Sequence, residues 1–283
     1  HCRVWGNIIT GNEMGVSLFW SGDNTVDNNT ITGNDGDALY LEYSDNNTVE
    51  QNAVSLNLGY TVDMIFSPWN VVIDNELVGT GIYIWECPRT RFLYNTVLDY
   101  SWGTFIDTCP DMEITGNVIW GGSGIDIFTS DDITVTGNGI NLNDYAVWAW
   151  ECPRLNITGN DLSRNGDYAI SAFGCDWSTF SGNTPSDNPN YGLYQDNSHD
   201  CVIEDNEAFN VTSFAILVVD SHRCGVVGNT LAGVDFGIYF QFSNDGLVDS
   251  NQVSDFEYAV EFDTVDVATV TNNTVSNSYH GIW

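Results

Sequence analysis

The sequence contains no lysine, and its cationic side chains are six arginines beside four histidines. Against these stand 39 acidic residues, which give a formal net charge of −33. Nucleic-acid binding needs a basic surface, so this composition excludes it. An acidic polymer would also be repelled unless metal ions bridged it to the protein.

Long apolar runs are also missing. No stretch of eighteen apolar residues occurs, and the amino terminus lacks the basic-then-apolar pattern of a signal peptide. We therefore expect no transmembrane segment in this stretch and a chain that corresponds to mature protein. No linker interrupts the sequence, so we expect one domain over residues 1–283. Because residues 281–283 match the start of an internal repeat at Gly81, we expect this domain to be a segment of a longer chain.

What the sequence does contain is a series of thirteen asparagines spaced 20 to 23 residues apart. An apolar residue stands three positions before each of them and, except at Pro185, two positions after. A fixed period of this length, with inward and outward residues alternating over three short segments, predicts stacked β-strands in which each period is one turn. We expect each asparagine to adopt the left-handed conformation at a bend, with amides hydrogen-bonded from turn to turn. These ladder asparagines are Asn7, Asn29, Asn52, Asn75, Asn95, Asn117, Asn138, Asn160, Asn183, Asn206, Asn229, Asn251 and Asn273.

This pattern resembles the right-handed parallel β-helix repeats of the pectate-lyase-like superfamily. Within it, the pattern is similar to the carbohydrate-binding and sugar-hydrolase repeat proteins that include the periplasmic copper-site accessory family. The resemblance extends over essentially all 283 residues. It implies an all-β fold, a right-handed parallel β-helix of about 13 turns, but catalytic and non-catalytic proteins share that fold. The acidic, lysine-free composition resembles that of extremely halophilic archaea, where salt screens self-repulsion; the alternative is an acidic secreted protein of a low-salt organism.

Outward positions twelve and ten residues before the ladder asparagines collect large aromatic and acidic residues. Exposed rings are costly unless something covers them. Flat rings and carboxylates suit sugars, and the resemblance implies that polysaccharide lies on this face. The alternatives are that another protein domain or subunit covers the rings, or that the rings stack and stabilise the sheet. The candidate ligand-binding residues are Tyr83, Trp85, Phe105, Phe128, Trp148, Trp150, Tyr194 and Tyr239.

The candidates for two carboxylates at the separation that glycosidases use are Asp107 with Asp126 on neighbouring turns, or Glu261 with Asp263 on one strand. However, the Asn-Thr-Asp, Gly-His-Gly and Arg-Ile-Lys motifs of the polygalacturonase branch are missing, and so is the Asp-Pro-His of the mannuronan epimerase branch. A polysaccharide lyase or glycosidase is therefore an alternative to a glycan-recognition module without catalysis.

Three arginines, Arg89, Arg154 and Arg223, lie six positions before a ladder asparagine, and aspartates occupy that column on adjacent turns. We expect ion pairs between turns rather than a catalytic role for these arginines.

Four of the seven cysteines lie eight positions before a ladder asparagine, in a column otherwise filled by serine, and two lie five before. Adjacent turns are about 4.8 Å apart, which is within the Cα range of a disulfide. Bridges between turns and free thiols that replace serine both fit this spacing, and an exported location favours bridges. The candidate pairs are Cys87 with Cys109, Cys152 with Cys175, and Cys201 with Cys224.

The third cysteine pair also belongs to a possible metal site. His199 and Cys201 on one turn, and His222 and Cys224 on the next, supply two imidazoles and two sulfurs. Such a set suits zinc, and the same soft donors suit copper. Calcium is a third possible divalent metal, in the case of a lyase. The alternative is a disulfide beside two solvated histidines.

Five Asn-x-Thr sequons fit a glycosylated surface protein, although the repeat itself generates Asn and Thr. The sequence thus predicts an extracellular or cell-surface scaffold or glycan-recognition module of a halophile, with a polysaccharide or a covering protein as its partner. The alternatives are a polysaccharide-active enzyme, a metal accessory protein, and a filament or viral appendage subunit. The candidate glycosylation sites are Asn28, Asn46, Asn156, Asn210 and Asn272.

Overall fold

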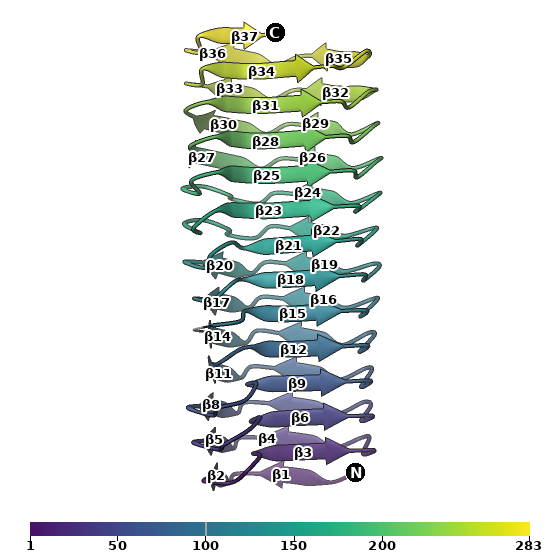
Figure 1. The fold of residues 1–283 in the computed structure, drawn as a ribbon, viewed down its shortest axis with the longest axis vertical. Helices are drawn as coiled ribbons and strands as arrows, with labels where there is room; N and C mark the ends of the chain where they lie inside the picture. Colours follow the sequence, from purple (N-terminus) through teal and green to yellow (C-terminus); the bar gives the residue numbers. More distant parts are fainter. Residues whose placement is uncertain (100) are drawn as a thin grey trace. The chain divides into compact units, whose positions relative to one another are not determined.

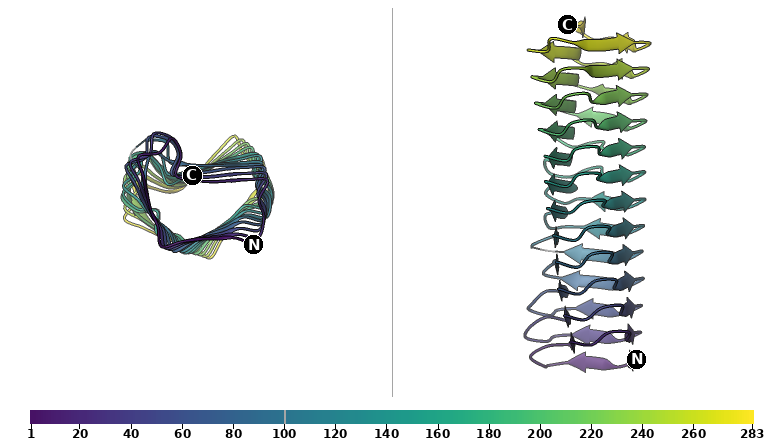
Figure 2. Two further views of the ribbon diagram at one scale, coloured as in Figure 1. Left: turned by 90° about the horizontal axis from the view of Figure 1, so that it is seen from below. Right: turned by 90° about the vertical axis from the view of Figure 1, so that its right-hand side faces the viewer.

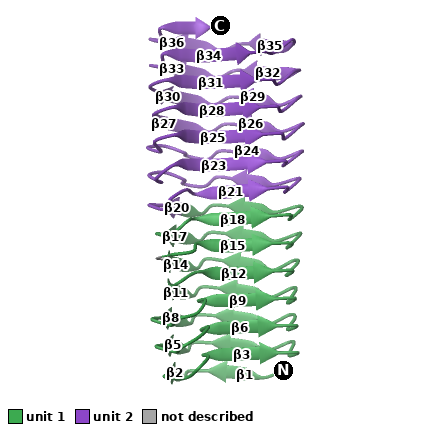
Figure 3. Cartoon of the chain, viewed as in Figure 1, with its two compact units in different colours: residues 1–139 green, residues 140–283 purple. Residues whose placement is uncertain are grey.

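The computed structural model describes residues 1–99 and 101–283. The described residues form 37 strands of three to six residues and no helix, so none of them belongs to an apolar helix long enough to span a membrane. The chain is an all-β, right-handed parallel β-solenoid of about 13 turns, as the sequence predicts. It divides into two compact units, unit 1 (His1–Gly139) and unit 2 (Ile140–Trp283) (Figure 3). The single domain over residues 1–283 stays a prediction.

Each turn of unit 1 has three strands, which we call the a-, b- and c-strands in chain order (Figure 1). Equivalent strands of successive turns pair in parallel. The a-strands are β1 (Arg3–Trp5), β4 (Thr25–Asp27), β7 (Thr48–Glu50), β10 (Val71–Ile73), β13 (Arg91–Leu93), β16 (Glu113–Thr115) and β19 (Thr134–Thr136). The b-strands are β2 (Ile8–Thr10), β5 (Thr30–Thr32), β8 (Ala53–Ser55), β11 (Glu76–Gly79), β14 (Thr96–Asp99) and β17 (Val118–Trp120), and β20 (Gly139–Asn141) begins at the last residue of the unit. The c-strands are β3 (Val16–Phe19), β6 (Leu39–Glu42), β9 (Val62–Ile65), β12 (Ile82–Trp85), β15 (Thr104–Asp107) and β18 (Ile125–Phe128).

Unit 2 repeats this plan, with c-strands that mostly have six residues instead of four. A single bridge between Asp161 and Thr184 stands where the first b-strand pairing would be. The c-strands are β21 (Val147–Trp150), β23 (Tyr168–Phe173), β25 (Tyr191–Asp196), β28 (Phe214–Val219), β31 (Phe236–Gln241), β34 (Tyr258–Asp263) and β37 (His280–Ile282). The a-strands are β22 (Asn156–Thr158), β24 (Thr179–Ser181), β26 (Val202–Glu204), β29 (Gly225–Val227), β32 (Gly246–Asp249) and β35 (Ala268–Thr271). The b-strands are β27 (Glu207–Val211), β30 (Thr230–Gly233), β33 (Gln252–Ser254) and β36 (Thr274–Ser276).

The core of each unit lies inside the turns, which overlie one another when viewed along the stack (Figure 2). Val72 pairs with Phe92, and Phe92 with Ile114, and all three side chains are fully buried. Each such side chain stabilises the fold by about 1.5–3 kcal/mol, because its apolar surface leaves water. The predicted inward columns are therefore confirmed.

The ladder asparagines hydrogen-bond from turn to turn, as predicted. The Oδ1 atom of Asn95 accepts hydrogen bonds from the backbone N and from the Nδ2 of Asn75, both at 3.0 Å. Asn117 accepts in the same way from Asn95. In unit 2 the same geometry begins at Asn160 and reaches Asn273. Each buried amide thus has partners for its donors and its acceptor, which offsets the cost of removing it from water.

The left-handed residue of each bend is the residue before the ladder asparagine, so that part of the expectation was wrong. Asp74, Tyr94 and Gly116 have φ of 54°, 53° and 69°, whereas the asparagines that follow them are not left-handed. The chain must finish its bend before the asparagine, because the amide has to point inward to reach the next turn.

Candidate functional site

The outward rings of the c-strands in unit 1 stack on one another. Tyr83 and Phe105 have ring centroids 5.3 Å apart and planes 7° apart, and Phe105 and Phe128 have values of 5.1 Å and 29°. Trp85 lies 4.7 Å from Phe66. Each ring in such a stack covers the face of its neighbour, so a ligand would meet mainly ring edges. This geometry favours the alternative in which the rings stabilise the sheet.

The predicted ligand-binding residues of unit 2 also contact other rings. Trp150 stacks on Phe173 with centroids 4.1 Å apart, and Tyr194 stacks on Tyr191 at 5.4 Å. Trp148 lies edge-on to Tyr145. The ring centroid of Tyr239 lies 5.5 Å from that of Phe214 and 5.4 Å from that of Phe236. Sugar binding by these eight predicted residues stays a prediction.

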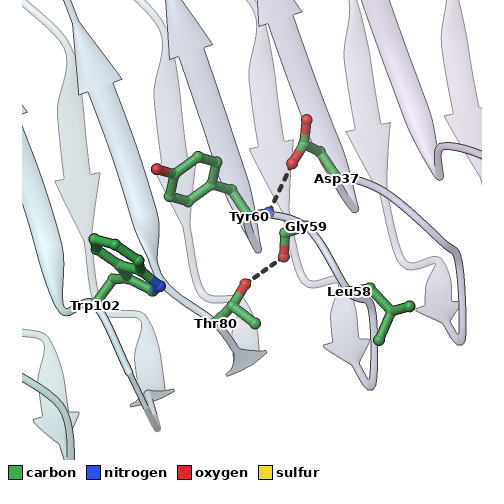
Figure 4. A pocket seen from close by; sticks show the side chains of 6 residues that line it. All are labelled: Asp37, Leu58, Gly59, Tyr60, Thr80 and Trp102. Carbon is green, nitrogen blue, oxygen red and sulfur yellow. Dashed lines mark hydrogen bonds between the residues drawn. The ribbon is translucent and has the colours of Figure 1, made fainter.

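A pocket of about 250 Å³ opens in unit 1 where the chain turns from b-strand to c-strand (Figure 4). The ring of Trp102 there is 69% exposed. The Oδ1 atom of Asp37 accepts a hydrogen bond of 2.6 Å from the backbone N of Tyr60, and the Thr80 hydroxyl donates to the Gly59 carbonyl. The lining residues are Asp37, Leu58, Gly59, Tyr60, Thr80 and Trp102.

Four lining residues of this pocket occupy one sequence column, fifteen positions before a ladder asparagine, which we call the corner column. In unit 2 this column is aromatic on every turn, and ring centroids from Tyr191 to His280 follow one another at 4.6–5.7 Å. The unit 2 members are Tyr145, Tyr168, Tyr191, Phe214, Phe236 and Tyr258, and His280 pairs with the last of them. In unit 1 the corner column reads Asp37, Tyr60, Thr80 and Trp102 over four turns. The column also holds Met14 and Ser123 in unit 1, so only Tyr60 and Trp102 are aromatic there, and the pocket lies where Asp37 and Thr80 stand in place of rings.

The sequence analysis missed this site because it considered only the positions twelve and ten residues before each ladder asparagine. The signal was present in the next outward column. Aromatic residues there are continuous near the carboxyl terminus and interrupted at Asp37 and Thr80.

Asp63 is a second residue that the sequence analysis did not single out. It lies on β9, where its Cα partners on the neighbouring turns are Tyr40 and Tyr83. Its side chain is 7% exposed, and its Oδ1 has no hydrogen-bond partner. Burial, followed by the negative charges of Asp37 and Glu42, raises the pKa of Asp63 to about 7. This carboxyl, which does not line the pocket but follows the lining residue Tyr60 by three positions, is therefore half protonated near neutral pH.

Tyr40 adds to the concentration of acidic groups around Asp63. Its hydroxyl donates a 2.7 Å hydrogen bond to Oε2 of Glu42. This bond and burial raise the pKa of Tyr40 to about 12. Glu42 thus has a donor, whereas Asp63 Oδ1 has none. No three His, Cys, Asp or Glu side chains in the described part of the chain are grouped closely enough to hold a metal ion.

The predicted carboxylate pair of β34 has two contrasting environments. Glu261 is 8% exposed, its Oε2 has no partner, and burial and the charge of Asp263 raise its pKa. Asp263 accepts hydrogen bonds from Gln241 at 3.0 Å, from Thr264 at 2.9 Å and from Tyr239 at 3.2 Å, and these bonds lower its pKa. Two neighbouring carboxyls whose pKa values are shifted in opposite directions are an arrangement that acid–base chemistry uses.

The other predicted pair, Asp107 and Asp126, lies on β15 and β18. Asp107 is the register partner of Phe128, and Asp126 is the partner of Phe105, so the two carboxylates are diagonal neighbours. Asp107 accepts hydrogen bonds from the hydroxyls of Thr108 and Thr129. Asp126 is 9% exposed. A catalytic role for this pair stays a prediction.

All seven cysteines, which lie within the described residues, are free thiols, so the predicted disulfides Cys87–Cys109, Cys152–Cys175 and Cys201–Cys224 are not formed. The thiols replace serine in the column. Cys87 Sγ donates to the Trp85 carbonyl at 3.2 Å, and Cys109 Sγ accepts from the backbone N of Cys87 at 3.2 Å. Burial raises the pKa of Cys87, which keeps this thiol protonated and unreactive.

The predicted Cys2His2 metal site is also not formed. The rings of His199 and His222 stack with centroids 5.1 Å apart, and each Nδ1 accepts a hydrogen bond from a backbone N–H of the following turn. Cys201 and Cys224 are buried and donate to backbone carbonyls. Asp200 and Arg223, which stand between each histidine and its cysteine, have φ of 58° and turn the chain, so the sulfurs are buried while the imidazoles stay half-buried at the corner and the four donors do not converge.

Ion pairs between turns are confirmed for two of the three predicted arginines. Arg89 Nε lies 3.2 Å from Asp111, and Arg223 Nε lies 2.6 Å from Asp200. The pairing of Arg154 stays a prediction. The five sequon asparagines are exposed, and their glycosylation also stays a prediction.

Comparisons with known proteins agree with this architecture. The model of the right-handed β-helix region matches residues 80–231 and 168–283, and the model of the periplasmic copper-binding protein (NosD) matches residues 1–123. No curated protein has significant similarity to the sequence.

Among solved structures, the A-module of the Azotobacter vinelandii mannuronan C-5 epimerase AlgE6 has a TM-score of 0.70 at 16% identity, covering 95% of this chain and 80% of its own. The periplasmic alginate epimerase AlgG has a TM-score of 0.61 at 9% identity, and the match covers 89% of this chain and 76% of AlgG. The Streptococcus pneumoniae surface protein and adhesin PfbA has 0.54 at 9% identity, covering 98% and 90%. At these identities the likeness concerns the fold. With the family model matching most of its length, the chain belongs to the right-handed β-helix family.

Proposed function

We propose that this protein recognises a polysaccharide, and that unit 1 binds one sugar unit in the gap of its corner column. The observation that carries the proposal is the pocket lined by Asp37, Tyr60, Thr80 and Trp102. Thr80 separates Tyr60 and Trp102 by two turn spacings, about 9.6 Å between their backbones. A pyranose ring can occupy a gap of this size with its apolar face against an indole.

The exposure of Trp102 supports this location over the stacked rings. Tyr83 and Phe105 use their faces against each other, whereas the Trp102 ring is 69% exposed beside the pocket. Sugar pockets combine such rings with a few polar groups that fix orientation, and here Asp37 and Thr80 supply a carboxylate and a hydroxyl.

The comparisons support the class of ligand and the location. The names of two structural neighbours refer to mannuronan and alginate, which are polysaccharides, and a third is a surface protein and adhesin. One matching family model is described as periplasmic. The proposal therefore includes an exported protein, at the cell surface or in the periplasm. The high-salt environment stays a prediction from composition.

Replacing Trp102 with alanine tests the proposal. In isothermal titration against panels of neutral, amine-bearing and uronate oligosaccharides, W102A loses binding that the parent protein shows. Trp20 is equally exposed, at 69%, but lies at the far end of a c-strand and stacks on Tyr43, so W20A is the matched control and keeps binding. Absence of binding to every oligosaccharide, or equal loss in W20A, would overturn the proposal.

Polysaccharide cleavage is a second candidate, favoured by the contrasting environments of Glu261 and Asp263. Its test is the release of reducing ends or unsaturated uronate from polysaccharides, which E261Q would abolish and which an inactive parent protein would exclude.

A further inference from the structure

We propose that the sugar bound in the gap of unit 1 carries a protonated amino group, as a glucosamine unit does, and that the Asp37 carboxylate binds it while the buried Asp63 carboxyl adds negative charge behind Asp37. This inference rests on the proposed function, since it names the sugar class for the same pocket. It differs from the uronates named for the structural neighbours, whose charge is of the opposite sign.

The first argument is the uncompensated negative charge around the pocket. Asp37 lines it, and Asp63 interacts electrostatically with Asp37 and Glu42. The arginines of unit 1 are engaged elsewhere, on or beside the a-strands. They are paired as Arg3 with Asp27, Arg89 with Asp111, and Arg91 with Glu113. A uronate would add another negative charge to this cluster, whereas an ammonium group would neutralise it.

The second argument is the missing hydrogen-bond donor at Asp63. Asp63 is only 7% exposed, and the oxygens of a carboxyl buried to this degree normally accept hydrogen bonds. Oδ1 of Asp63 has no hydrogen-bond partner. Neighbouring turns contribute no cation to it. The titratable groups that face Asp63 are Asp37, Tyr40 and Glu42 on the preceding turn, Tyr60 in its own turn and Tyr83 on the next. Because this oxygen is closed to solvent, an ammonium group bound at Asp37 favours the ionised form of Asp63 through its charge and not by direct contact.

The third argument is the aromatic surroundings. Tyr60 and Trp102 border the gap, and Tyr83 stacks on Tyr60 with centroids 5.5 Å apart. Aromatic rings attract ammonium groups through their negative faces, and they also cover the apolar face of a pyranose. The same groups give no such advantage to a carboxylate-bearing sugar.

Recognition of the ammonium group by this pair has a measurable signature. Near pH 6.5 most Asp63 side chains are protonated, because the pKa is about 7. A bound cation lowers that pKa, so binding releases a proton from the protein. Affinity for the amine-bearing sugar therefore rises as the pH increases from 5 to 7, as long as the sugar amine itself stays protonated.

The experiment is isothermal titration with four probes: a glucosamine tetramer, an N-acetylglucosamine tetramer, a mannuronate tetramer and spermidine. We expect the glucosamine tetramer to bind at least about tenfold more tightly than its acetylated counterpart, which is what one charge-assisted hydrogen bond provides. Titrations at pH 6.5 in two buffers of different ionisation enthalpy show proton release with the parent protein. D63N abolishes the proton release, and D37N weakens binding of the glucosamine tetramer about tenfold.

The outcomes separate this inference from the proposed function. Equal affinity for the two glucosamine-based tetramers, with W102A still losing both, overturns the amine and keeps the polysaccharide site. Proton release that persists in D63N also overturns the role of Asp63. Spermidine binding as tight as that of the glucosamine tetramer reduces the site to a bare cation site and contradicts the sugar. No binding by any oligosaccharide rejects both proposals. Circular dichroism of D63N and D37N confirms that each variant is folded.

Discussion

The corner column has different contents in the two units, and the difference separates stability from recognition. In unit 2 it is a continuous run of rings, in which Phe214 lies 4.6 Å from Phe236 and 5.7 Å from Tyr191. In unit 1 the same column is interrupted by Asp37 and Thr80, and a pocket occupies the interruption. The corner residue begins most of the c-strands of unit 2, as Phe214 does, but precedes the c-strands of unit 1, as Thr80 does, so local backbone and side chain together decide whether a turn adds stacking energy or admits a ligand.

The two buried carboxyls of the c-strands differ in a related way. Asp63 has acidic and phenolic neighbours, and its pKa is raised to about 7. Glu261 lies beside Asp263, which has three donors, and the charge of His280 partly opposes the rise in the pKa of Glu261. A carboxyl without compensation destabilises the fold when it ionises, and a site that tolerates this cost is a candidate for ligand binding.

The largest expected effect is on the pH dependence of stability in the variant D63N, which tests the difference between Asp63 and Glu261. The pKa of Asp63 is higher in the folded protein, at about 7, than its ordinary value of 3.8. The folded state therefore binds the proton more tightly, and stability falls as the pH rises from about 4 to about 7, by up to about 4 kcal/mol at 1.36 kcal/mol per pKa unit. D63N lacks this loss, so we expect its urea midpoint to exceed that of the parent protein at pH 8 and to match it at pH 4.

The matched variant in unit 2 is E261Q. E261Q is expected to raise the urea midpoint at pH 8 as D63N does, because burial raises the pKa of Glu261. We expect the increase to be smaller than that for D63N. A gain for E261Q equal to that for D63N would remove the distinction between the two carboxyls.

A gap made in unit 2 is expected to have the next largest effect. F214T removes one ring from the continuous stack, and we expect a loss of about 2–3 kcal/mol, since Phe214 is half-buried and contacts rings on both sides. Urea unfolding followed by tryptophan fluorescence measures it. An unchanged midpoint would mean that the stack does not stabilise the c-strands.

The smallest expected change in stability comes from closing the gap in unit 1. T80F places a ring between Tyr60 and Trp102, which restores the aromatic column of unit 2. We expect a gain of about 0.5–1.5 kcal/mol from the new ring contacts together with complete loss of oligosaccharide binding. Retained binding in a folded T80F protein would place the ligand outside the pocket.

The sequence by itself determined the solenoid, its period and its core. Ladder residues such as Asn75 and Asn95 recur once per turn, and a buried amide must find partners on the next turn, so the spacing fixes which residues become neighbours in space. The ion pairs of Arg89 and Arg223 follow from the same register.

Only the tertiary structure decided the side-chain directions and hydrogen-bond partners, because the register of the turns does not determine them. Matching columns brought Cys87 and Cys109 close together, but side-chain direction made them a thiol ladder. The left-handed residues Asp200 and Arg223 turn the chain between histidine and cysteine, which kept Cys201 and Cys224 away from the imidazoles. Likewise, the unpaired Oδ1 and the raised pKa of Asp63 result from its burial between neighbouring turns and from the charges of Asp37 and Glu42. A periodic sequence specifies which residues are adjacent, whereas burial, side-chain direction and local field exist only after the turns have packed.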